Sequence, residues 1–384
     1  MNALANLSPR ARELYDKLAD FNECIPAEKE YEAALGTGAQ RWTTQPAIME
    51  HLKSRAKALG LWNLFLPREH AEGAGLTNLE YACLAELTGR SPQIAPEATN
   101  CSAPDTGNME LLAKYGSPEQ KERWLKPLLD GTMRSAFAMT EKNVASSDAL
   151  NIETTIERVG DEYVVNGHKW YISGAGHPHF GVWIVLGKRD DANHGHFEVK
   201  FTNVRVPAHS ALVLGEGRGF EVIQGRLGPG RVHHCCRSLG MAERALELGI
   251  VRVRDRGATF GQPLASHGVI RKYLADARMK LDQARLLVWY TADAIDRVGA
   301  KGALKEIAMI KVVVPNVACE VVDSMIQLFG AAGVSQDTVL PYFYAGLRTL
   351  RIADGPDEVH TQQIGRLELR RYDALKPKQL AGKL

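Results

Sequence analysis

Two short runs of this sequence carry side chains that can do chemistry. Asp354 stands before Gly355 and Pro356, and its carboxylate could accept a proton as a general base. Asp-Gly-Pro is also ordinary turn chemistry, so Asp354 taken alone indicates a turn carboxylate more strongly than a catalytic one. The Gly-Pro-Gly-Arg run that ends at Arg231 could hold a phosphate, although a lone glycine-rich turn more often only starts a helix.

Histidines and cysteines offer weaker signals. The His-Pro-His run at 177–179 and the His-Gly-His run at 194–196 lack a carboxylate or Cys at ligand spacing, which favours solvated loop histidines over a metal site. We expect His233 and His234 to pack in or cap a helix, with a ligand contact as the less favoured alternative. The six cysteines show no CxxC spacing and are predicted to be buried, reduced thiols.

The region up to residue 133 is predicted to be helical, because it contains residues typical of helix starts and helix ends. Ser117-Pro118-Glu119-Gln120 fits a capping box with Pro at the first helical position. Gly60 and Gly116 suit helix ends. We therefore predict an N-terminal helical domain over residues 1–133.

From Arg134 the sequence changes to short segments of strand-like composition, which predicts a middle β domain over residues 134–214. Asn166-Gly167 between two β-branched and aromatic runs predicts a two-residue hairpin turn. Phe197, Val199 and Phe201 alternate with polar residues, as in a half-buried strand. Residues 215–219 are predicted to be the exit loop.

The last region, residues 215–384, returns to apolar spacing of about 3.6 residues, which predicts long helices of a bundle. The spaced positions include Ile270, Leu274, Ala277, Leu281, Ile307, Ile310, Val314, Val317 and Val321. Without an internal repeat or low-complexity linker, we expect the three regions to pack as one compact unit.

Composition excludes several classes of protein. The 384 residues have 45% hydrophobic and 24% charged members, which is typical of a globular chain with a large core. A net charge of +2 gives no reason to expect nucleic acid or an anionic membrane as partner. Charged residues interrupt every hydrophobic segment before about 18 apolar residues, so we expect no membrane span. The N-terminus shows no signal-peptide pattern, and a cytoplasmic location is the default expectation.

Several further runs, taken together, resemble the acyl-CoA dehydrogenase family. The resemblance begins with Ala-Met-Thr-Glu at 138–141, followed by Ala-Ser-Ser-Asp-Ala at 145–149, a moderately specific signature. The runs that follow in the family's order are residues 169–173, 259–261, 327–333 and 352–356. Taken together, these runs are strong evidence for the resemblance, which covers nearly the whole chain. The runs at 103–108 and 353–360 look like the branch sometimes fused to a kinase-like domain.

The resemblance implies a mainly α fold with a central β domain: a helical N-terminal domain, a β-barrel-like middle domain and a C-terminal four-helix bundle. It also implies FAD as cofactor, an acyl-CoA substrate, electron-transfer flavoprotein as acceptor, and a homodimer or homotetramer. The positions that match the family's cofactor contacts are Phe137, Met139, Thr140, Ser147, Tyr171, Ser173, Arg256, Phe260, Gln327, Gly330, Ala331 and Pro356. Those expected to meet substrate are Ser147, Arg231 and Gly355.

The resemblance identifies Asp354 as the catalytic base, because many members of the family have Glu in a Tyr-Glu-Gly-Thr run at this place. Asp is one methylene shorter, so the backbone must bring it closer to the thioester. In the family the base removes the α-proton of the thioester, and the β-hydride goes to the flavin, giving the trans-2-enoyl-CoA.

Two departures from the family pattern stand out. The Arg that usually lies three residues before the Phe-Gly pair is replaced by Gly257, and Arg256 lies one residue earlier. The stretch around 188–194 is far shorter than in the family, which implies a shortened β domain or an omitted segment.

Two other functions stay open on the same scaffold. An acyl-CoA oxidase or a nitroalkane oxidase would differ in its access to oxygen. A non-catalytic flavin- or DNA-binding protein is the alternative from another class, although the net charge of +2 supports no basic stripe for DNA. Acyl length, branching and hydroxylation of the substrate are not readable from the sequence.

Overall fold

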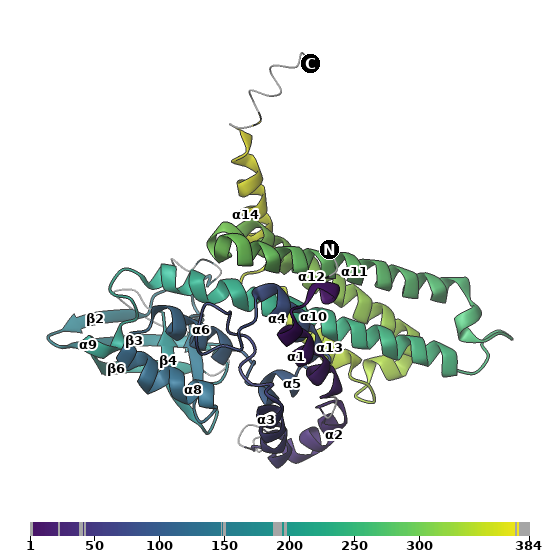
Figure 1. Cartoon of the computed structure of the whole chain (residues 1–384), viewed down its shortest axis with the longest axis horizontal. Helices are drawn as coiled ribbons and strands as arrows, with labels where there is room; N and C mark the ends of the chain where they lie inside the picture. The colour runs from purple at the N-terminus through teal and green to yellow at the C-terminus, as the bar shows by residue number, and fades with distance from the viewer. Residues whose placement is uncertain are drawn as a thin grey trace. The chain divides into compact units, whose positions relative to one another are not determined.

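The computed structural model describes residues 3–21, 24–37, 41, 44–146, 148, 151–186, 194–195, 198–372 and 375. They divide into two compact units that interleave along the chain, so the expectation of a single compact unit is wrong. Unit 1 contains Met1–Ser8, Asn78–Pro92 and Arg231–Leu384, and unit 2 contains Pro9–Thr77 and Gln93–Gly230. The long helix α10 (Gly219–Asp255) begins in unit 2 and ends in unit 1 (Figure 1).

Unit 2 opens with short helices whose ends agree with the sequence signals. Gly60 closes α3 in a left-handed conformation (φ 75°), and Gly116 follows α6. The capping box at Ser117 is confirmed, because its hydroxyl accepts from the N–H of Gln120 while the Gln120 side chain accepts from the N–H of Ser117. The helical segments are α1 (Pro9–Asp20), α2 (Cys24–Leu35), α3 (Ala47–Leu59), α5 (Ala95–Ala98), α6 (Asp105–Tyr115), α7 (Pro118–Gln120), a π-helical turn (Lys121–Leu125), α8 (Lys126–Asp130) and α9 (Ala208–Ala211).

The strands of unit 2 form two small sheets. β1 (Arg134–Ala138) pairs in parallel with β4 (Phe180–Val185). The second sheet is built on β3 (Glu162–Trp170), which pairs antiparallel with β2 (Thr155–Val159) and β6 (Val199–Pro207) and in parallel with β5 (His194–Gly195). The predicted middle β region and its half-buried strand at Val199 and Phe201 are therefore confirmed, while Phe197 lies outside the described residues.

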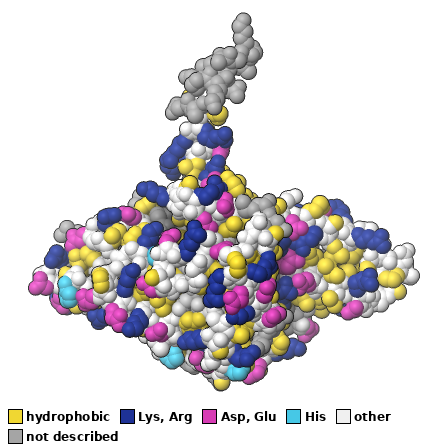
Figure 2. All heavy atoms as spheres, in the orientation of Figure 1, with side chains coloured by type: hydrophobic (Ala, Val, Ile, Leu, Met, Phe, Trp, Pro, Cys, Tyr) yellow, Lys and Arg dark blue, Asp and Glu magenta, His cyan; other side chains and the backbone are white. Residues whose placement is uncertain are grey.

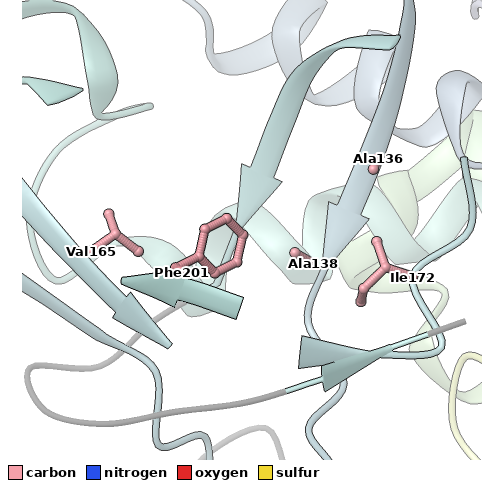
Figure 3. Close-up of a cluster of buried hydrophobic side chains, with 5 residues drawn as sticks. All are labelled: Ala136, Ala138, Val165, Ile172 and Phe201. Atoms are coloured by element: carbon pink, nitrogen blue, oxygen red, sulfur yellow. The ribbon is translucent and has the colours of Figure 1, made fainter. Parts of the chain in front are cut away.

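The core of this β region gathers small and large apolar side chains from several strands. Ala136 and Ala138 of β1 lie with Val165 of β3, Ile172 and Phe201 of β6, all less than one tenth exposed (Figure 3). Because strand side chains alternate between faces, the two alanines point the same way from β1 and leave the intervening Phe137 on the opposite face. This alternation presents Phe137 away from the core.

The predicted hairpin turn at Asn166-Gly167 is wrong. Both residues lie inside β3, and the turn that joins β2 to β3 is Gly160-Asp161, with Gly160 at φ +63°. The pair marks an irregularity instead, since the β3–β6 register shifts between Val165 and Gly167. A Cβ on Gly167 would lie 2.5 Å from the Thr154 side chain, so glycine is required there by close packing.

Unit 1 is a bundle of long helices, as the apolar spacing predicts. Ile270, Ala277 and Leu281 of α11 are buried, as are Ile307 and Val314 of α12. The elements are η1 (Leu4–Asn6), α4 (Asn78–Gly89), the C-terminal part of α10, η4 (Leu264–Ser266), α11 (Gly268–Gly302), α12 (Leu304–Phe329), η5 (Gly330–Val334), α13 (Leu340–Leu350) and α14 (Asp357–Leu369).

Within unit 1, glycines set how α4 and α10 cross. A Cβ on Gly240 would lie 2.0 Å from the Glu86 carbonyl oxygen, and one on Gly89 would lie 2.2 Å from the Arg237 carbonyl oxygen. No larger residue fits at either position without separating the helices. The close contact at these two glycines fixes which face of α10 is turned toward α4. It therefore also fixes the direction in which the side chains near Arg237 point.

One sequence expectation about α10 is wrong. The Gly-Pro-Gly-Arg run at 228–231 does not start a helix, because α10 begins at Gly219 and continues through Pro229. His233 and His234 therefore lie within a long helix and not at its start.

The residues Leu304–Val334 are long and apolar enough to cross a membrane by length and composition alone. The same features mark the core helix of a globular bundle, and α12 has a buried side that includes Ile310, Val314 and Met325. Lys311 and Glu320 interrupt its apolar run. The composition of α12 is therefore only weak evidence for a membrane segment.

Candidate active site

Asp354 lies in the turn between α13 and α14 of unit 1, as the Asp-Gly-Pro run predicts. Asp354 and Gly355 both have left-handed backbones, with φ of +56° and +98°. A Cβ on Gly355 would lie 2.8 Å from His360 Nε2, so glycine allows the turn to pass close to α14. Pro356 is the N-cap of α14. A non-glycine residue in this conformation is uncommon and stores strain, a feature that clusters at functional sites.

Side chains from three helices hold the main chain of this turn. Arg231 of α10 donates from Nε to the Asp354 carbonyl oxygen at 3.1 Å. His360 of α14 faces the same oxygen from Nε2 at 3.2 Å, and a carbonyl only accepts, so this nitrogen carries the proton. Lys311 of α12 donates to the Leu350 carbonyl at the end of α13. The turn is thus anchored before any ligand arrives.

Burial sets the protonation of these anchors. Burial, helped by the nearby Arg231 charge, lowers the pKa of His360 to about 4, so its ring is neutral at neutral pH. Burial also lowers the pKa of Lys311, against an opposing effect of the Asp354 carboxylate. The positive charges of Arg231 and Lys311 are attracted by the Asp354 carboxylate, which opposes the effect of burial on both of their pKa values.

The carboxyl group of Asp354 itself is reachable. Its side chain is 26% exposed, and its Oδ2 lies 3.5 Å from Nε2 of His234 on α10. An oriented, partly exposed carboxylate can take a proton from a carbon acid that binds against it. This contact is not the packing or capping role that the sequence predicts for His234. The available signal was its spacing, because Arg231 and His234 are three residues apart and share one helix face.

In unit 2, the predicted flavin positions come together where β1 and β3 end. The Trp170 N–H donates to the Thr140 carbonyl at 3.0 Å, which joins the two chain segments just beyond the strands. Tyr171 has a left-handed backbone (φ +57°) and is 57% exposed, and Ser173 is also exposed. Ile172 between them is buried in the core of Figure 3. The side chains of Tyr171 and Ser173 are therefore exposed on this turn, while the buried side chain of Ile172 holds the turn against the core.

A buried ion pair holds the Met139–Glu141 segment in place. Lys169 Nζ lies 2.5 Å from Glu141 Oε1 and donates to the Met139 carbonyl at 3.0 Å, and both charged side chains are fully buried. Burial lowers the pKa of Lys169 to about 8. The Glu141 pKa is lowered overall, because hydrogen bonds from Lys169 and Thr154 outweigh the opposing effect of burial.

The chemistry of this set fits a flavin ring. Phe137 and Met139 offer apolar surface, while Thr140, Tyr171 and Ser173 offer hydroxyl groups, the mixture that a flat ring with one polar edge requires. One face of the Phe137 ring is already covered, since the Arg226 guanidinium lies 3.7 Å from its centroid. Arg226 is not among the site residues that the sequence predicts. A Cβ on Gly107 would lie 3.1 Å from the Arg226 Cζ, so this glycine leaves room for the guanidinium.

Five other predicted cofactor positions lie on two further segments of unit 1. Gln327, Gly330 and Ala331 are exposed at the end of α12, where Gly330 has a backbone (φ 64°, ψ −140°) that essentially only glycine adopts. Arg256 and Phe260 lie on the tight turn after α10, and Phe260 is 95% exposed. Ser147 lies outside the described residues, as does most of the shortened stretch around 188–194. The cofactor and substrate roles of these residues, and of Arg231, Gly355 and Pro356, stay predictions.

No metal site accompanies these groups in the part of the chain that the structure describes. Within it, no three His, Cys, Asp or Glu side chains are grouped to hold an ion. His177 and His179 lie with their rings 5.5 Å apart, while His196 is outside the described residues.

Comparison with known proteins gives the family. Acyl-CoA dehydrogenase domain models match in chain order: the N-terminal domain over residues 26–132, the middle domain over 136–219 and the C-terminal domain over 217–369. The chain is 49% identical to the Mycobacterium tuberculosis protein named "Probable acyl-CoA dehydrogenase FadE2", over 95% of this chain and 97% of that one. It is 48% identical to Acyl-CoA dehydrogenase family member 11 of Gallus gallus, over 94% of this chain but only 51% of that protein. The chain thus spans about half the length of the latter relative.

Solved structures agree. A Mycobacterium abscessus structure described as an acyl-CoA dehydrogenase superposes with a TM-score of 0.87 at 44% identity, covering 95% of this chain and 99% of that one. A glutaryl-CoA dehydrogenase from Mycobacterium smegmatis in complex with FADH2 has the same fold, with a TM-score of 0.77 at 20% identity over 94% of this chain and 95% of that one. The predicted three-part architecture is confirmed, and the chain belongs to the acyl-CoA dehydrogenase family of oxidoreductases.

Proposed function

We propose that this chain is an FAD-dependent dehydrogenase that converts an acyl-CoA thioester to the trans-2-enoyl-CoA, with Asp354 as the base. The observation that carries the proposal is the Asp354 carboxylate, one quarter exposed in a strained turn that side chains of α10, α12 and α14 anchor. Family membership supports the reaction class.

The chain's own residues account for the proton. Asp354 accepts the α-proton of the thioester, and the electron pair left on the α-carbon becomes the new α,β double bond as hydride leaves the β-carbon. FAD, when bound, accepts that hydride. The anchored turn keeps the base in position through the reaction, because Arg231 and His360 hold its carbonyl and not its carboxylate. Arg231 and Lys311 supply positive charge that stabilises the carboxylate before the proton arrives.

The flavin ring would lie against the exposed segment of unit 2 that carries Thr140, Tyr171 and Ser173. The buried Lys169–Glu141 pair sets the shape of that segment, so it is pre-formed for a ligand. The exposed Gln327, Gly330 and Ala331 would meet the cofactor of a neighbouring subunit, where a glycine lets main chain approach closely.

Further parts of the proposal follow from the family. The chain would work as a homodimer or homotetramer in fatty acid metabolism and pass electrons to an electron-transfer flavoprotein. A cytoplasmic location is proposed as the default and does not come from the family. The exposed apolar residue Phe260, on the turn after α10, supports an intermolecular role for this turn.

The test is Asp354→Asn, which preserves the shape of the side chain and removes the proton acceptor. FAD-loaded protein is mixed with a panel of acyl-CoA thioesters without oxygen, and loss of flavin absorbance is followed. The variant should bind FAD and reduce it about 10² to 10⁴ times more slowly than the parent. Glu358→Gln is the matched control, because Glu358 is an exposed carboxylate on the first turn of α14, and it should keep the parent rate.

Each other outcome has a definite meaning. Near-parent reduction by Asp354→Asn would place the base elsewhere. Rapid reoxidation by oxygen with release of peroxide would favour an oxidase. FAD binding without reduction by any acyl-CoA would favour a non-catalytic flavoprotein. Lys, Arg, Asp and Glu side chains are interspersed on the face shown in Figure 2, which gives no support there to a DNA-binding stripe.

A further inference from the structure

His234 and Asp354 meet although 120 positions separate them in the chain. Nε2 of His234 lies 3.5 Å from Oδ2 of Asp354, and the two side chains are 25% and 26% exposed. Both belong to unit 1, where the close crossing of α4 and α10 at Gly89 and Gly240 sets the rotation of α10. The contact is with the carboxylate itself, whereas Arg231 and His360 contact the Asp354 carbonyl.

The other ring nitrogen of His234 determines which nitrogen carries the proton. Nη2 of Arg237, one turn further along α10, lies 3.3 Å from His234 Nδ1. A guanidinium can only donate, so Nδ1 accepts and has no proton. A neutral ring then carries its proton on Nε2, the nitrogen that faces Asp354. Arg237 therefore selects the tautomer in which His234 donates toward the carboxylate.

We propose that His234 is a positioning residue for Asp354: its Nε2–H holds Oδ2, which directs Oδ1 toward the α-proton of the substrate. This role rests on the proposed function of Asp354 as the base. The 3.5 Å separation is long for a hydrogen bond, and catalytic contacts of this kind shorten once substrate excludes water. The short Asp side chain makes orientation matter, because it has fewer torsions with which to reach a bound thioester than Glu has.

The proton balance is simple. The α-proton moves from the substrate carbon to Oδ1, and the Nε2 proton of His234 stays on the ring throughout. A donor held against a carboxylate favours its charged form, so His234 also keeps Asp354 able to accept a proton at lower pH. In the described part of the chain, the other ionisable groups that act on Asp354 or on His234 include Arg231, Arg237, Cys235, Lys311 and His360. They remain in place when only His234 is replaced.

The experiment compares His234→Leu, which removes the donor, with His234→Gln, whose side-chain amide places an N–H near the position of Nε2. Reduction of FAD-loaded protein by a good acyl-CoA is followed without oxygen from pH 5.5 to 9. We expect His234→Leu to lower the limiting rate about 10- to 100-fold with little change in substrate affinity, and to move the acidic limb of the profile up by about one pH unit. His234→Gln should recover most of the rate and the position of the limb.

His233→Leu is the matched control, because the His233 ring packs edge-on against Tyr81 at 4.8 Å. It should keep the parent pH profile even where it changes thermal stability. A readout independent of turnover is the nitrogen NMR spectrum of protein labelled in its histidine rings, with His234 assigned by its loss in His234→Gln. We expect a protonated Nε2 and an unprotonated Nδ1, and Arg237→Met should disturb this pattern.

The outcomes separate this role from the proposed function. Should the parent reduce FAD while His234→Leu keeps both its rate and its acidic limb, the positioning role is wrong and Asp354 can still be the base. A protonated Nδ1 in the parent overturns it equally, whether or not His234→Leu folds. Failure of every acyl-CoA to reduce the parent would reject the proposed function and the role of His234 with it.

Discussion

Replacing Lys169 with Met tests how the flavin segment of unit 2 is held. The change removes the cation that pairs with Glu141, while the carboxylate stays fully buried. Three donors remain to Glu141, namely the N–H of Glu153, the N–H of Thr154 and the Thr154 hydroxyl. Breaking a buried pair on one side usually costs about 3 to 5 kcal/mol.

The loss in free energy of unfolding has an upper limit, because Glu141 in the variant can bind a proton and become neutral once the Lys169 cation is gone. From the ordinary glutamate pKa of 4.5, protonating this carboxyl at pH 7 costs about 3.4 kcal/mol, at about 1.36 kcal/mol per pH unit. The Met139 carbonyl also loses its donor, for about 1 kcal/mol more. We therefore expect Lys169→Met to lose about 3 to 4 kcal/mol of the free energy of unfolding at pH 7, and progressively less toward pH 5.

Urea denaturation of the FAD-free protein at pH 5, 6 and 7 measures this, from the shift in midpoint at a common slope. Lys142→Met is the matched control, because Lys142 is half exposed and its nearest carboxylate oxygen, on Glu198, is 3.9 Å away. The double variant Lys169→Met/Glu141→Gln should regain much of the loss, since no buried charge is left. FAD affinity should fall with stability in the single variant. A loss that stays the same from pH 5 to 7, or is below about 1 kcal/mol at pH 7, would refute this account.

Two further predictions concern a buried carboxyl and the assembly. Burial raises the pKa of Glu110 on α6 to about 8, and in the described part of the chain neither of its carboxyl oxygens has a hydrogen-bond partner. The pKa of Glu110 is higher in the folded than in the unfolded protein, so the parent loses stability as pH rises from about 4.5 through 8. The melting temperature of Glu110→Gln should therefore exceed that of the parent by an amount that grows over this pH range. Glu119→Gln, at an exposed position, should show no such trend. Light scattering of FAD-loaded protein should show a dimer or tetramer, and a monomer with bound FAD would contradict the proposed role of Gln327 and Gly330.

Local signals in the sequence were reliable where the structure depends on neighbours in the chain. The capping box at Ser117 and the helix end at Gly60 were predicted because a few adjacent residues satisfy the backbone groups at a helix terminus. The long helices of unit 1 followed from apolar spacing, because one stripe of each helix must be buried. These features need no knowledge of the rest of the fold.

Signals that admit two structural causes were less reliable. Asn166-Gly167 has the composition of a hairpin turn, yet Gly167 is needed because the Thr154 side chain packs against its backbone. The glycines at 228 and 230 look like a helix start, yet α10 runs through them. Glycine is selected both by positive φ and by close approach, and only the neighbours in space reveal which cause applies.

By itself the sequence determined the family's fold and located Asp354, because the order of the motifs carries that information and Asp-Gly-Pro forms its turn locally. It did not reveal that His234 contacts the Asp354 carboxylate or that Arg226 covers Phe137. Those contacts join residues far apart in the chain. Tertiary structure decided them. Within unit 1, the rotation of α10 depends on its close packing against α4 at Gly89 and Gly240, and that rotation sets whether His234 reaches the turn of Asp354.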